Sequence, residues 1–242
     1  MNKHNTLPYI FVLFDLDDTL WNFKENSKAA LEDIFDQYNL QYYYATFDEY
    51  AKSYEENNQA LWRLYGKQQI TKSFLHVERF LAPLRPFGIL DTSLAGKMGT
   101  AYLDRCAEKT TTMPHAIETL EYLCPKYDLS IISNGFGEVQ YKKLHRSGLS
   151  SYFSHVFLSE TIGYQKPKPE FFNEVLCELG ASKEECLVIG DNYEADIEGA
   201  MNFGLDQVYY LPDKLSIDNI VLPHPPTHII CDLLSLCVLL KY

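Results

Sequence analysis

The feature that most constrains the fold is an uninterrupted apolar run, residues 9–14, which ends directly in the carboxylates Asp15, Asp17 and Asp18. Because polar and apolar residues do not alternate in this run, it predicts a strand buried on both faces, as in a parallel sheet. The carboxylates then lie at the carboxyl end of the strand, where open α/β sheets bind ligands. Crowded carboxylates repel one another unless a cation or a shared proton relieves them. The stretch therefore predicts a site for a hard cation such as Mg²⁺, and an acidic surface turn is the alternative.

The composition narrows the class of protein. The chain has 242 residues, 46% of them hydrophobic, which suffices for one large domain or for one domain with an inserted module. No apolar run approaches the ~20 residues that cross a bilayer, and residues 1–8 lack the apolar region of a signal peptide. The six cysteines form no CxxC pair, which favours reduced packing residues over disulfides or a zinc site. We therefore expect a cytoplasmic protein.

The net charge bears on the partners. A formal net charge of −12 argues against binding to nucleic acid polymers and to anionic membranes. It still allows an anionic substrate where the site carries local positive charge. We therefore expect a small molecule as the partner.

Residues 24–103 differ in pattern from the sequence around them. They carry no buried-strand signal, and apolar residues at helical spacing over 29–35, 47–64, 74–81 and 92–106 predict four helices. Thr71 is suited to cap the third helix, and residues 83–88 break it. An ordinary crossover between parallel strands is far shorter than these roughly 80 residues. We therefore predict an all-α helical bundle, residues 23–103, inserted into an α/β core of residues 1–22 and 104–242.

An α/β pattern resumes after residue 113. Apolar runs predict strands at 128–133, 155–158, 186–190 and 207–211, and an edge strand at 227–231. Helices are predicted at 116–124, 139–148, 168–180, 194–203 and 233–240, with a loop over 212–226, which holds four prolines. Strands that alternate with helices imply right-handed crossovers, and hence a Rossmann-like parallel sheet flanked by helices.

Polar residues follow the next two predicted strands as well. Ser133, Asn134 and Gly135 form a loop whose hydroxyl and backbone N–H groups suit a phosphate, although a simple cap of the following helix is the alternative. Lys166 and Lys168 each precede a proline, which restricts the backbone and so positions an ammonium group. The spacing does not choose between the two lysines, and a solvated basic turn is the alternative for both.

The strand at 186–190 repeats the pattern of the first one. It ends in Gly190, Asp191 follows at its tip, and Asp196 lies in the first turns of the next predicted helix. Asp196 also suits the positive end of that helix without any chemical role. Because the carboxyl ends of parallel strands share one edge of the sheet, we expect these groups to meet Asp15 and Asp17 there.

This arrangement resembles the haloacid dehalogenase superfamily of aspartate-nucleophile hydrolases over the full length of the chain. Its four motifs appear in order as Asp15-x-Asp17-x-Thr19, Ser133-Asn134-Gly135, Lys166-Pro167 and Gly190-Asp191-x-x-x-x-Asp196. The inserted helices are similar to the cap of the subfamily that holds phosphoglycolate phosphatases, β-phosphoglucomutases and dehalogenases. The resemblance thus implies that superfamily's α/β core with a helical cap.

The resemblance also implies roles for the first motif. Asp15 would attack the phosphorus of a monoester and form an aspartyl phosphate. Asp17 would protonate the leaving alcohol and then activate water. Mg²⁺ would be held by Asp15, Asp191 and the backbone carbonyl of Asp17. Thr19 would hold the nucleophile loop by hydrogen bonds.

The other motifs are implied to bind the phosphate group. Lys166 and Ser133, with the backbone N–H of Asn134, would stabilise its oxygens. Asp196 would orient Lys166 or a metal-bound water, and Gly135 would support the phosphate loop. An acid at position 17 favours phosphoryl transfer, because a departing halide needs no proton.

Two further stretches look like the pyrimidine 5'-nucleotidase branch of the superfamily. They are residues 57–62 with 70–71 and 79–80 in the predicted cap, and 134–136 with 146–149 and 152–153 in the core. They imply a nucleoside 5'-monophosphate as the substrate. The alternatives are a phosphatase for sugar phosphates or phosphoglycolate, a β-phosphoglucomutase-like mutase, a haloacid dehalogenase and a non-catalytic binding protein.

The cap of such enzymes chooses the leaving group. Asn22 and Phe23 at its hinge are candidate substrate contacts. Trp62 and Arg63 are two more, although Trp62 equally suits packing between cap helices. Three consecutive tyrosines at 42–44 suit either the cap core or an interface, and we expect a monomer or a homodimer.

Overall fold

The computed structural model describes residues 9–212 and 221–241. Within them, residues 24–110 form one compact unit and the remaining described residues form another. The predicted boundary at residue 103 falls inside helix α4 (Thr92–Glu108). Buried Met98, Tyr102 and Cys106 continue at helical spacing on both sides of that position. The helix therefore runs on, and the boundary lies later than predicted.

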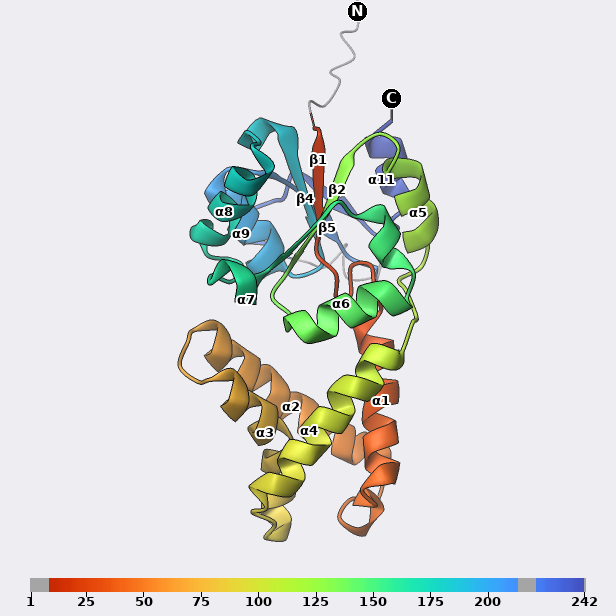
Figure 1. The fold of residues 1–242 in the computed structure, drawn as a ribbon, viewed down its shortest axis with the longest axis vertical. Helices are drawn as coiled ribbons and strands as arrows, with labels where there is room; N and C mark the ends of the chain where they lie inside the picture. The colour runs from red at the N-terminus through yellow and green to blue at the C-terminus, as the bar shows by residue number, and fades with distance from the viewer. Residues whose placement is uncertain (1–8, 213–220, 242) are drawn as a thin grey trace, which may run out of the picture. The chain divides into compact units, whose positions relative to one another are not determined.

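The larger unit is built on a six-stranded parallel sheet with the strand order β3-β2-β1-β4-β5-β6 (Figure 1). The strands are β1 (Phe11–Phe14), β2 (Asp128–Ser133), β3 (His155–Leu158), β4 (Cys186–Gly190), β5 (Asp206–Tyr210) and β6 (His228–Ile230). The predicted parallel sheet is thus confirmed. The order reverses at β1, which pairs with β2 on one side and β4 on the other. Ligands of such sheets bind beyond the carboxyl ends of the strands at this switch point.

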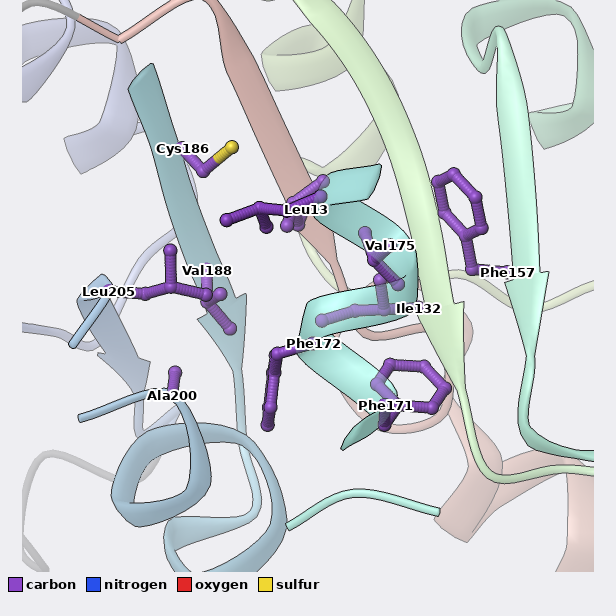
Figure 2. Close-up of a cluster of buried hydrophobic side chains, with 11 residues drawn as sticks. Leu13, Ile132, Phe157, Phe171, Phe172, Val175, Cys186, Val188, Ala200 and Leu205 are labelled. Carbon is purple, nitrogen blue, oxygen red and sulfur yellow. The ribbon is translucent and has the colours of Figure 1, made fainter. Parts of the chain in front are cut away.

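Helices cover both faces of the sheet (Figure 1). They are α5 (Ala116–Leu123), α6 (Gly137–Arg146), α7 (Ser159–Ile162), α8 (Pro169–Leu179), α9 (Gly199–Phe203) and α11 (Ser235–Leu239). Figure 2 shows Phe171, Phe172 and Val175 of α8 packed against Leu13 of β1 and Ile132 of β2. Because both faces are covered, the strands appear in the sequence as continuous apolar runs.

Two predicted elements differ from the structure. The first strand begins only at Phe11, and the preceding Ile10 is 48% exposed. The helix predicted over 194–203 is wrong in its first half, because residues Tyr193–Glu198 form a π-helical turn, η5. The amide of Ile197 donates to the carbonyl of Asn192, five residues earlier. Of the predicted loop 212–226, residues 213–220 lie outside the described residues.

The helical unit contains the four predicted helices. They are α1 (Phe23–Gln37), α2 (Phe47–Gly66), α3 (Lys72–Leu81) and α4. Thr71 caps α3 as predicted, since its side chain accepts a hydrogen bond from the amide of Phe74 at 3.2 Å. The predicted break after α3 is a 3₁₀ helix, η2 (Ala82–Phe87).

Aromatic side chains fill the helical unit. The ring of Tyr54 lies 5.0 Å from that of Phe80 and 5.7 Å from that of Tyr102. Of the three consecutive tyrosines, Tyr44 packs against Tyr50 and belongs to this core, whereas Tyr42 is 82% exposed. The cluster at 42–44 is therefore divided between core and surface.

The remaining candidates from the sequence are two residues of α2 and the cysteines. Trp62 of α2 is half-buried with its ring against Tyr65, and Arg63 is exposed. The cysteines of the described residues form no disulfide; Cys106 and Cys186 are buried, so they pack as predicted, while others such as Cys124 are exposed. None of the helices in the described residues combines the length and hydropathy that a bilayer crossing requires.

Candidate active site

The first acidic residue is held by the sheet itself. β1 ends at Phe14, and the amide of Asp15 still donates to the carbonyl of Ile189 on β4 at 2.8 Å. The chain then turns sharply at Asp18, whose φ is 59°. The amide of Asp18 donates to the carbonyl of Trp21 at 2.8 Å and closes the turn. Asp15 is only 9% exposed, so its carboxylate is fixed at the switch point of the sheet.

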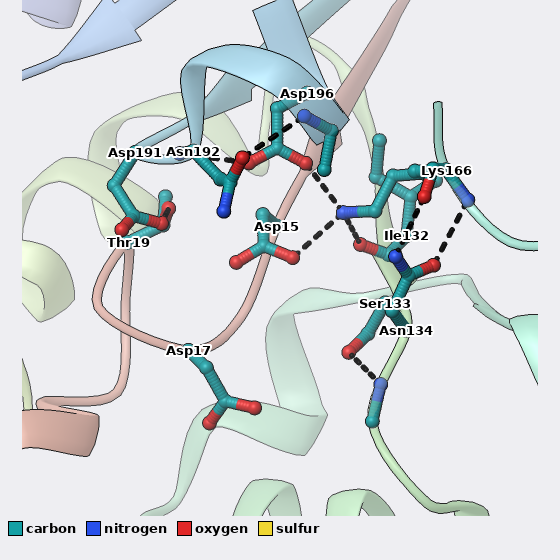
Figure 3. A network of polar contacts seen from close by, with 12 residues as sticks. Asp15, Asp17, Thr19, Ile132, Ser133, Asn134, Lys166, Asp191, Asn192 and Asp196 are labelled. Atoms are coloured by element: carbon teal, nitrogen blue, oxygen red, sulfur yellow. Dashed lines mark hydrogen bonds and ion pairs between the residues drawn. The ribbon is translucent and has the colours of Figure 1, made fainter. Parts of the chain in front are cut away.

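Lys166 is the lysine that reaches this carboxylate. Its Nζ donates to Oδ1 of Asp15 at 2.7 Å, to Oδ1 of Asp196 at 2.6 Å and to the carbonyl of Ile132 at 2.8 Å (Figure 3). All three protons of the ammonium group are thereby used. Lys168, which the spacing alone did not distinguish from it, instead precedes the first residue of α8.

The side chain of Asn134 fixes the backbone of Lys166. Its Nδ2 donates to the Lys166 carbonyl at 2.9 Å, and its Oδ1 accepts from the Lys166 amide at 3.0 Å. The family resemblance implied a role only for the backbone N–H of Asn134. The paired amide contact is a second one, and it ties the loop after β2 to the loop that carries the lysine.

Three carboxylates gather around this lysine. Oxygens of Asp15, Asp191 and Asp196 all lie within 4.8 Å of one another. Thr19 is fully buried and donates to Oδ1 of Asp191 at 3.1 Å, so it joins the loop after β1 to the tip of β4. The structure thus brings the first, third and fourth motifs together.

Asp196 is turned inward by the π-helical turn η5. Its Oδ2 accepts from the amide of Asn192 at 3.1 Å, while its other oxygen meets Lys166. A Cβ atom on Gly190 would lie 2.3 Å from Oδ2 and 2.5 Å from Cβ of Asp196. Glycine at the tip of β4 is therefore required for the close approach of Asp196.

The cluster holds more negative charge than Lys166 neutralises. Burial raises the pKa of the Asp15 carboxyl to about 7 against the opposing charge of Lys166. Burial, followed by the charge of Asp15, raises the pKa of Asp191 to about 9. Burial disfavours the ammonium of Lys166, but the charges of Asp15 and Asp196 outweigh it and raise the pKa of the lysine. Such a cluster takes up either protons or a cation.

The residues present fit a hard divalent cation. Their donor atoms are carboxylate oxygens, the ligands that Mg²⁺ prefers. Asp15 and Asp191 each have one oxygen in a described hydrogen bond, to Lys166 and Thr19 respectively, and each has a second oxygen to offer. Asp196 differs from them, because both of its oxygens accept described hydrogen bonds, one from Lys166 and one from the amide of Asn192.

Asp17 lies in a second polar cluster. Its carboxylate points away from that of Asp15 (Figure 3). Lys143 donates to its Oδ1 at 2.6 Å, and Gln140 donates to its Oδ2 at 2.8 Å. Gln140 also donates to the hydroxyl of Ser133 at 2.7 Å. The Ser133 oxygen therefore accepts, which leaves its proton to donate.

Sequence reasoning missed Gln140 and Lys143. Both are on α6 and both are at most 3% exposed. At helical spacing they share a face with Phe136 and Leu144, which are buried. Two polar residues on an otherwise apolar helix face are the signal that could have found them.

Known proteins are similar to this chain in sequence. The family model described as haloacid dehalogenase-like hydrolase matches residues 12–209. HAD-hydrolase YfnB of Bacillus subtilis is 34% identical over 88% of this chain and 86% of its own. Pyrimidine 5'-nucleotidase PynA of Streptococcus pneumoniae is 35% identical over 86% of each chain.

A solved structure shows the same fold. The crystal structure of Bacillus subtilis YfnB bound to magnesium has a TM-score of 0.85 with this chain at 31% sequence identity. The match covers 97% of this chain and 99% of that one. The family model, the two relatives and the solved structure all indicate the same family. The chain belongs to the haloacid dehalogenase-like hydrolase family and is a hydrolase of that family.

Proposed function

We propose that this hydrolase is a Mg²⁺-dependent phosphatase that cleaves small organic phosphate monoesters through an aspartyl phosphate on Asp15. One observation carries the proposal. At the switch point of the sheet, the Asp15 carboxylate touches the ammonium of Lys166 and lies within 4.8 Å of oxygens of Asp191 and Asp196. A carboxylate nucleophile, a phosphate-binding cation and a metal-binding acid are thus adjacent.

In the first half-reaction, an oxygen of Asp15 attacks phosphorus and the bond to the leaving oxygen breaks. Asp17 reacts in its protonated form and gives its proton to that oxygen, so an alcohol departs. Lys166 stabilises the charge on the phosphoryl oxygens, and the Ser133 hydroxyl and the Asn134 backbone N–H donate to them. Preorganisation of Lys166 by Asn134 and Asp196 keeps that charge in place before the substrate arrives.

In the second half-reaction, water attacks the phosphorus of the aspartyl phosphate. Asp17, now ionised, takes a proton from this water, and the bond between phosphorus and Asp15 breaks. Inorganic phosphate leaves, and both carboxyl groups return to their starting states.

The metal would be held by the carboxylates of Asp15 and Asp191 and by the backbone carbonyl of Asp17. When bound, Mg²⁺ supplies positive charge that lets an anionic carboxylate approach an anionic phosphate. Thr19 fixes the orientation of Asp191 through the 3.1 Å hydrogen bond. Asp196 holds Lys166 by accepting a hydrogen bond from its ammonium group at 2.6 Å.

The proposed substrate class is a nucleoside 5'-monophosphate. Its support is the 35% identity to pyrimidine 5'-nucleotidase PynA and the nucleotidase-like stretches of the sequence. Asp17 supports phosphoryl transfer over dehalogenation, because a leaving alkoxide needs a proton and a leaving halide does not.

The test is release of inorganic phosphate from a panel of pyrimidine and purine nucleotides, sugar phosphates and phosphoglycolate, each with Mg²⁺ and with EDTA. We expect metal-dependent turnover, fastest with pyrimidine nucleotides. Asp15→Asn should abolish it while the fold is retained, and Asp36→Asn, at an exposed position of α1, should leave it unchanged. A panel without metal-dependent turnover would refute the phosphatase, and an isomerised sugar phosphate would indicate a mutase.

A further inference from the structure

A second buried lysine, Lys143, lies beside the segment that follows β1. The side chain of Lys143 is 4% exposed, and its Nζ donates to Oδ1 of Asp17 at 2.6 Å. The same ammonium group lies 4.3 Å from the ring centroid of Trp21 and 5.2 Å from that of Phe23. Aromatic faces attract cations. The lysine is thus held by one carboxylate and two rings, all from the segment that follows β1.

Gln140 completes the hold on Asp17. It is fully buried, and its Nε2 donates both to Oδ2 of Asp17 and to Oγ of Ser133. The amide nitrogen of Gln140 must face Asp17, because an ionised carboxylate only accepts hydrogen bonds and has no proton to donate to an amide oxygen. In this orientation Oε1 of Gln140 is buried without a hydrogen-bond partner among the described residues. Such a group costs free energy, so the contact with Asp17 is kept at the expense of local stability.

The backbone is shaped to admit Gln140. A Cβ atom on Gly135 would lie 2.2 Å from Nε2 and 2.5 Å from Cδ of Gln140. The amide of Gly135 also donates to Oγ of Ser133 at 3.1 Å. The glycine of the second motif therefore makes room for the side chain that reaches Asp17.

We propose that Lys143 and Gln140 are positioning residues for proton transfer by Asp17. Each binds one oxygen of the carboxylate, so together they fix both its direction and the plane of its oxygens. A proton donor must lie within hydrogen-bond reach of the leaving oxygen. An error of about 1 Å in its position can lower the rate by about 100-fold. This inference rests on the proposed phosphatase function.

Leaving groups of different basicity provide the test. An alkyl phosphate such as a nucleoside 5'-monophosphate needs its leaving oxygen protonated, whereas p-nitrophenyl phosphate releases a stable phenolate. We expect Lys143→Met to lower kcat/KM by about 10–100-fold for the nucleotide and by less than about 3-fold for p-nitrophenyl phosphate. Gln140→Leu should give the same pattern with a smaller loss. Lys143→Arg should restore part of the nucleotide activity.

The matched control is Lys142→Met, the same substitution one position earlier on α6 at an exposed site, and it should leave both substrates unaffected. Melting curves with and without Mg²⁺ establish that each variant folds and keeps the metal site. Equal losses on the two substrates for both Lys143→Met and Gln140→Leu would overturn the inference, because they indicate general disruption.

Asp17→Asn in the same assay separates the two proposals. A leaving-group-dependent loss in Asp17→Asn, without one in the Lys143 and Gln140 variants, would reject the positioning role and keep the phosphatase. Failure of the unaltered protein to turn over either substrate would reject the phosphatase itself. If Lys143→Met does not fold, Gln140→Leu and Lys143→Arg carry the comparison.

Discussion

The two buried lysines of the core differ in how their charge is matched. Lys166 meets two carboxylates and a backbone carbonyl, and a third carboxylate, Asp191, lies within the same cluster. Lys143 meets the single carboxylate of Asp17 and two aromatic rings. The first site has an excess of negative charge, and the second is balanced one to one.

The charge balance of each site determines what that site can bind. A cluster with excess carboxylate attracts a further cation, which is the requirement of a metal-assisted nucleophile. The balanced pair of Lys143 and Asp17, beside two aromatic rings, needs no further cation. It fixes the position of the Asp17 carboxylate. The two lysines therefore act on Asp15 and Asp17 in different ways, although those residues are only two positions apart.

The largest effect should come from removal of the charge at the first site. Lys166→Met leaves Asp15 and Asp196 buried without their ammonium partner, which costs about 3–5 kcal/mol of stability. We expect phosphatase activity to fall by about 10³-fold, because the cation that faces the phosphoryl oxygens is lost. Thermal melting and steady-state kinetics measure the two effects. Activity within tenfold of the unaltered protein would contradict the assignment of Lys166.

The tight packing of the first site can be tested by a methyl group. In Gly190→Ala the new Cβ meets the Cβ of Asp196, which is close to the backbone and cannot swing away. We expect a loss of about 1–3 kcal/mol in the free energy of unfolding and a displaced Lys166. Denaturant unfolding checks this, and a variant as stable as the parent would show that η5 adapts freely.

The charge excess at the first site predicts a dependence of stability on pH. The pKa values of Asp15 and Asp191 are raised from 3.8 to about 7 and about 9 in the folded protein. Between the unfolded and folded pKa values, the folded state therefore binds more protons than the unfolded chain, so the free energy of unfolding falls as pH rises. We expect the Tm of the metal-free protein to be at least about 2–4 °C lower at pH 8 than at pH 5, the shift that about 1 kcal/mol produces.

Two comparisons sharpen that measurement. Mg²⁺ should raise the Tm more at pH 8 than at pH 5, because the ion then need not displace protons. Asp191→Asn removes one of the two raised groups and should flatten the fall. An unchanged slope in Asp191→Asn would mean that the pH dependence arises elsewhere in the chain.

The smallest effect should come from the glycine at the second site. In Gly135→Ala the new Cβ meets the far end of the Gln140 side chain, which can move. We expect less than about 1 kcal/mol of destabilisation, with a few-fold lower kcat/KM for nucleotides and little change for p-nitrophenyl phosphate. A loss of stability as large as that of Gly190→Ala would remove the distinction between the two sites.

Much of the fold could be predicted from hydrophobic patterning. The strands β2, β3 and β4 have the predicted bounds, because each is a short apolar run that ends at a polar residue. The π-helical turn η5 could not be predicted from the sequence. Its wider turn has no distinct apolar period, and it is accompanied by contacts of Asp196 with Asn192 and Lys166.

The residues of the site that follow strands could be predicted from the sequence. Those that lie on helix α6 were not predicted. Asp15, Ser133 and Asp191 come directly after apolar runs, so their convergence follows from the parallel sheet. Lys143 and Gln140 approach from α6, and their targets depend on tertiary packing. Spacing alone did not separate Lys166 from Lys168; the family resemblance pointed to Lys166, and the contact with Asp15 is made by Lys166.

The proposed mechanism requires Asp15 as the nucleophile, and trapping of the covalent intermediate tests this role directly. The protein is mixed with substrate and Mg²⁺, quenched in acid and treated with borohydride, which reduces an acyl phosphate to an alcohol. Peptide mass spectrometry then identifies the modified residue. We expect homoserine at position 15 in the unaltered protein, and none in Asp15→Asn. Modification at Asp17 or Asp191 instead, or the absence of any modified peptide during rapid turnover, would contradict this role.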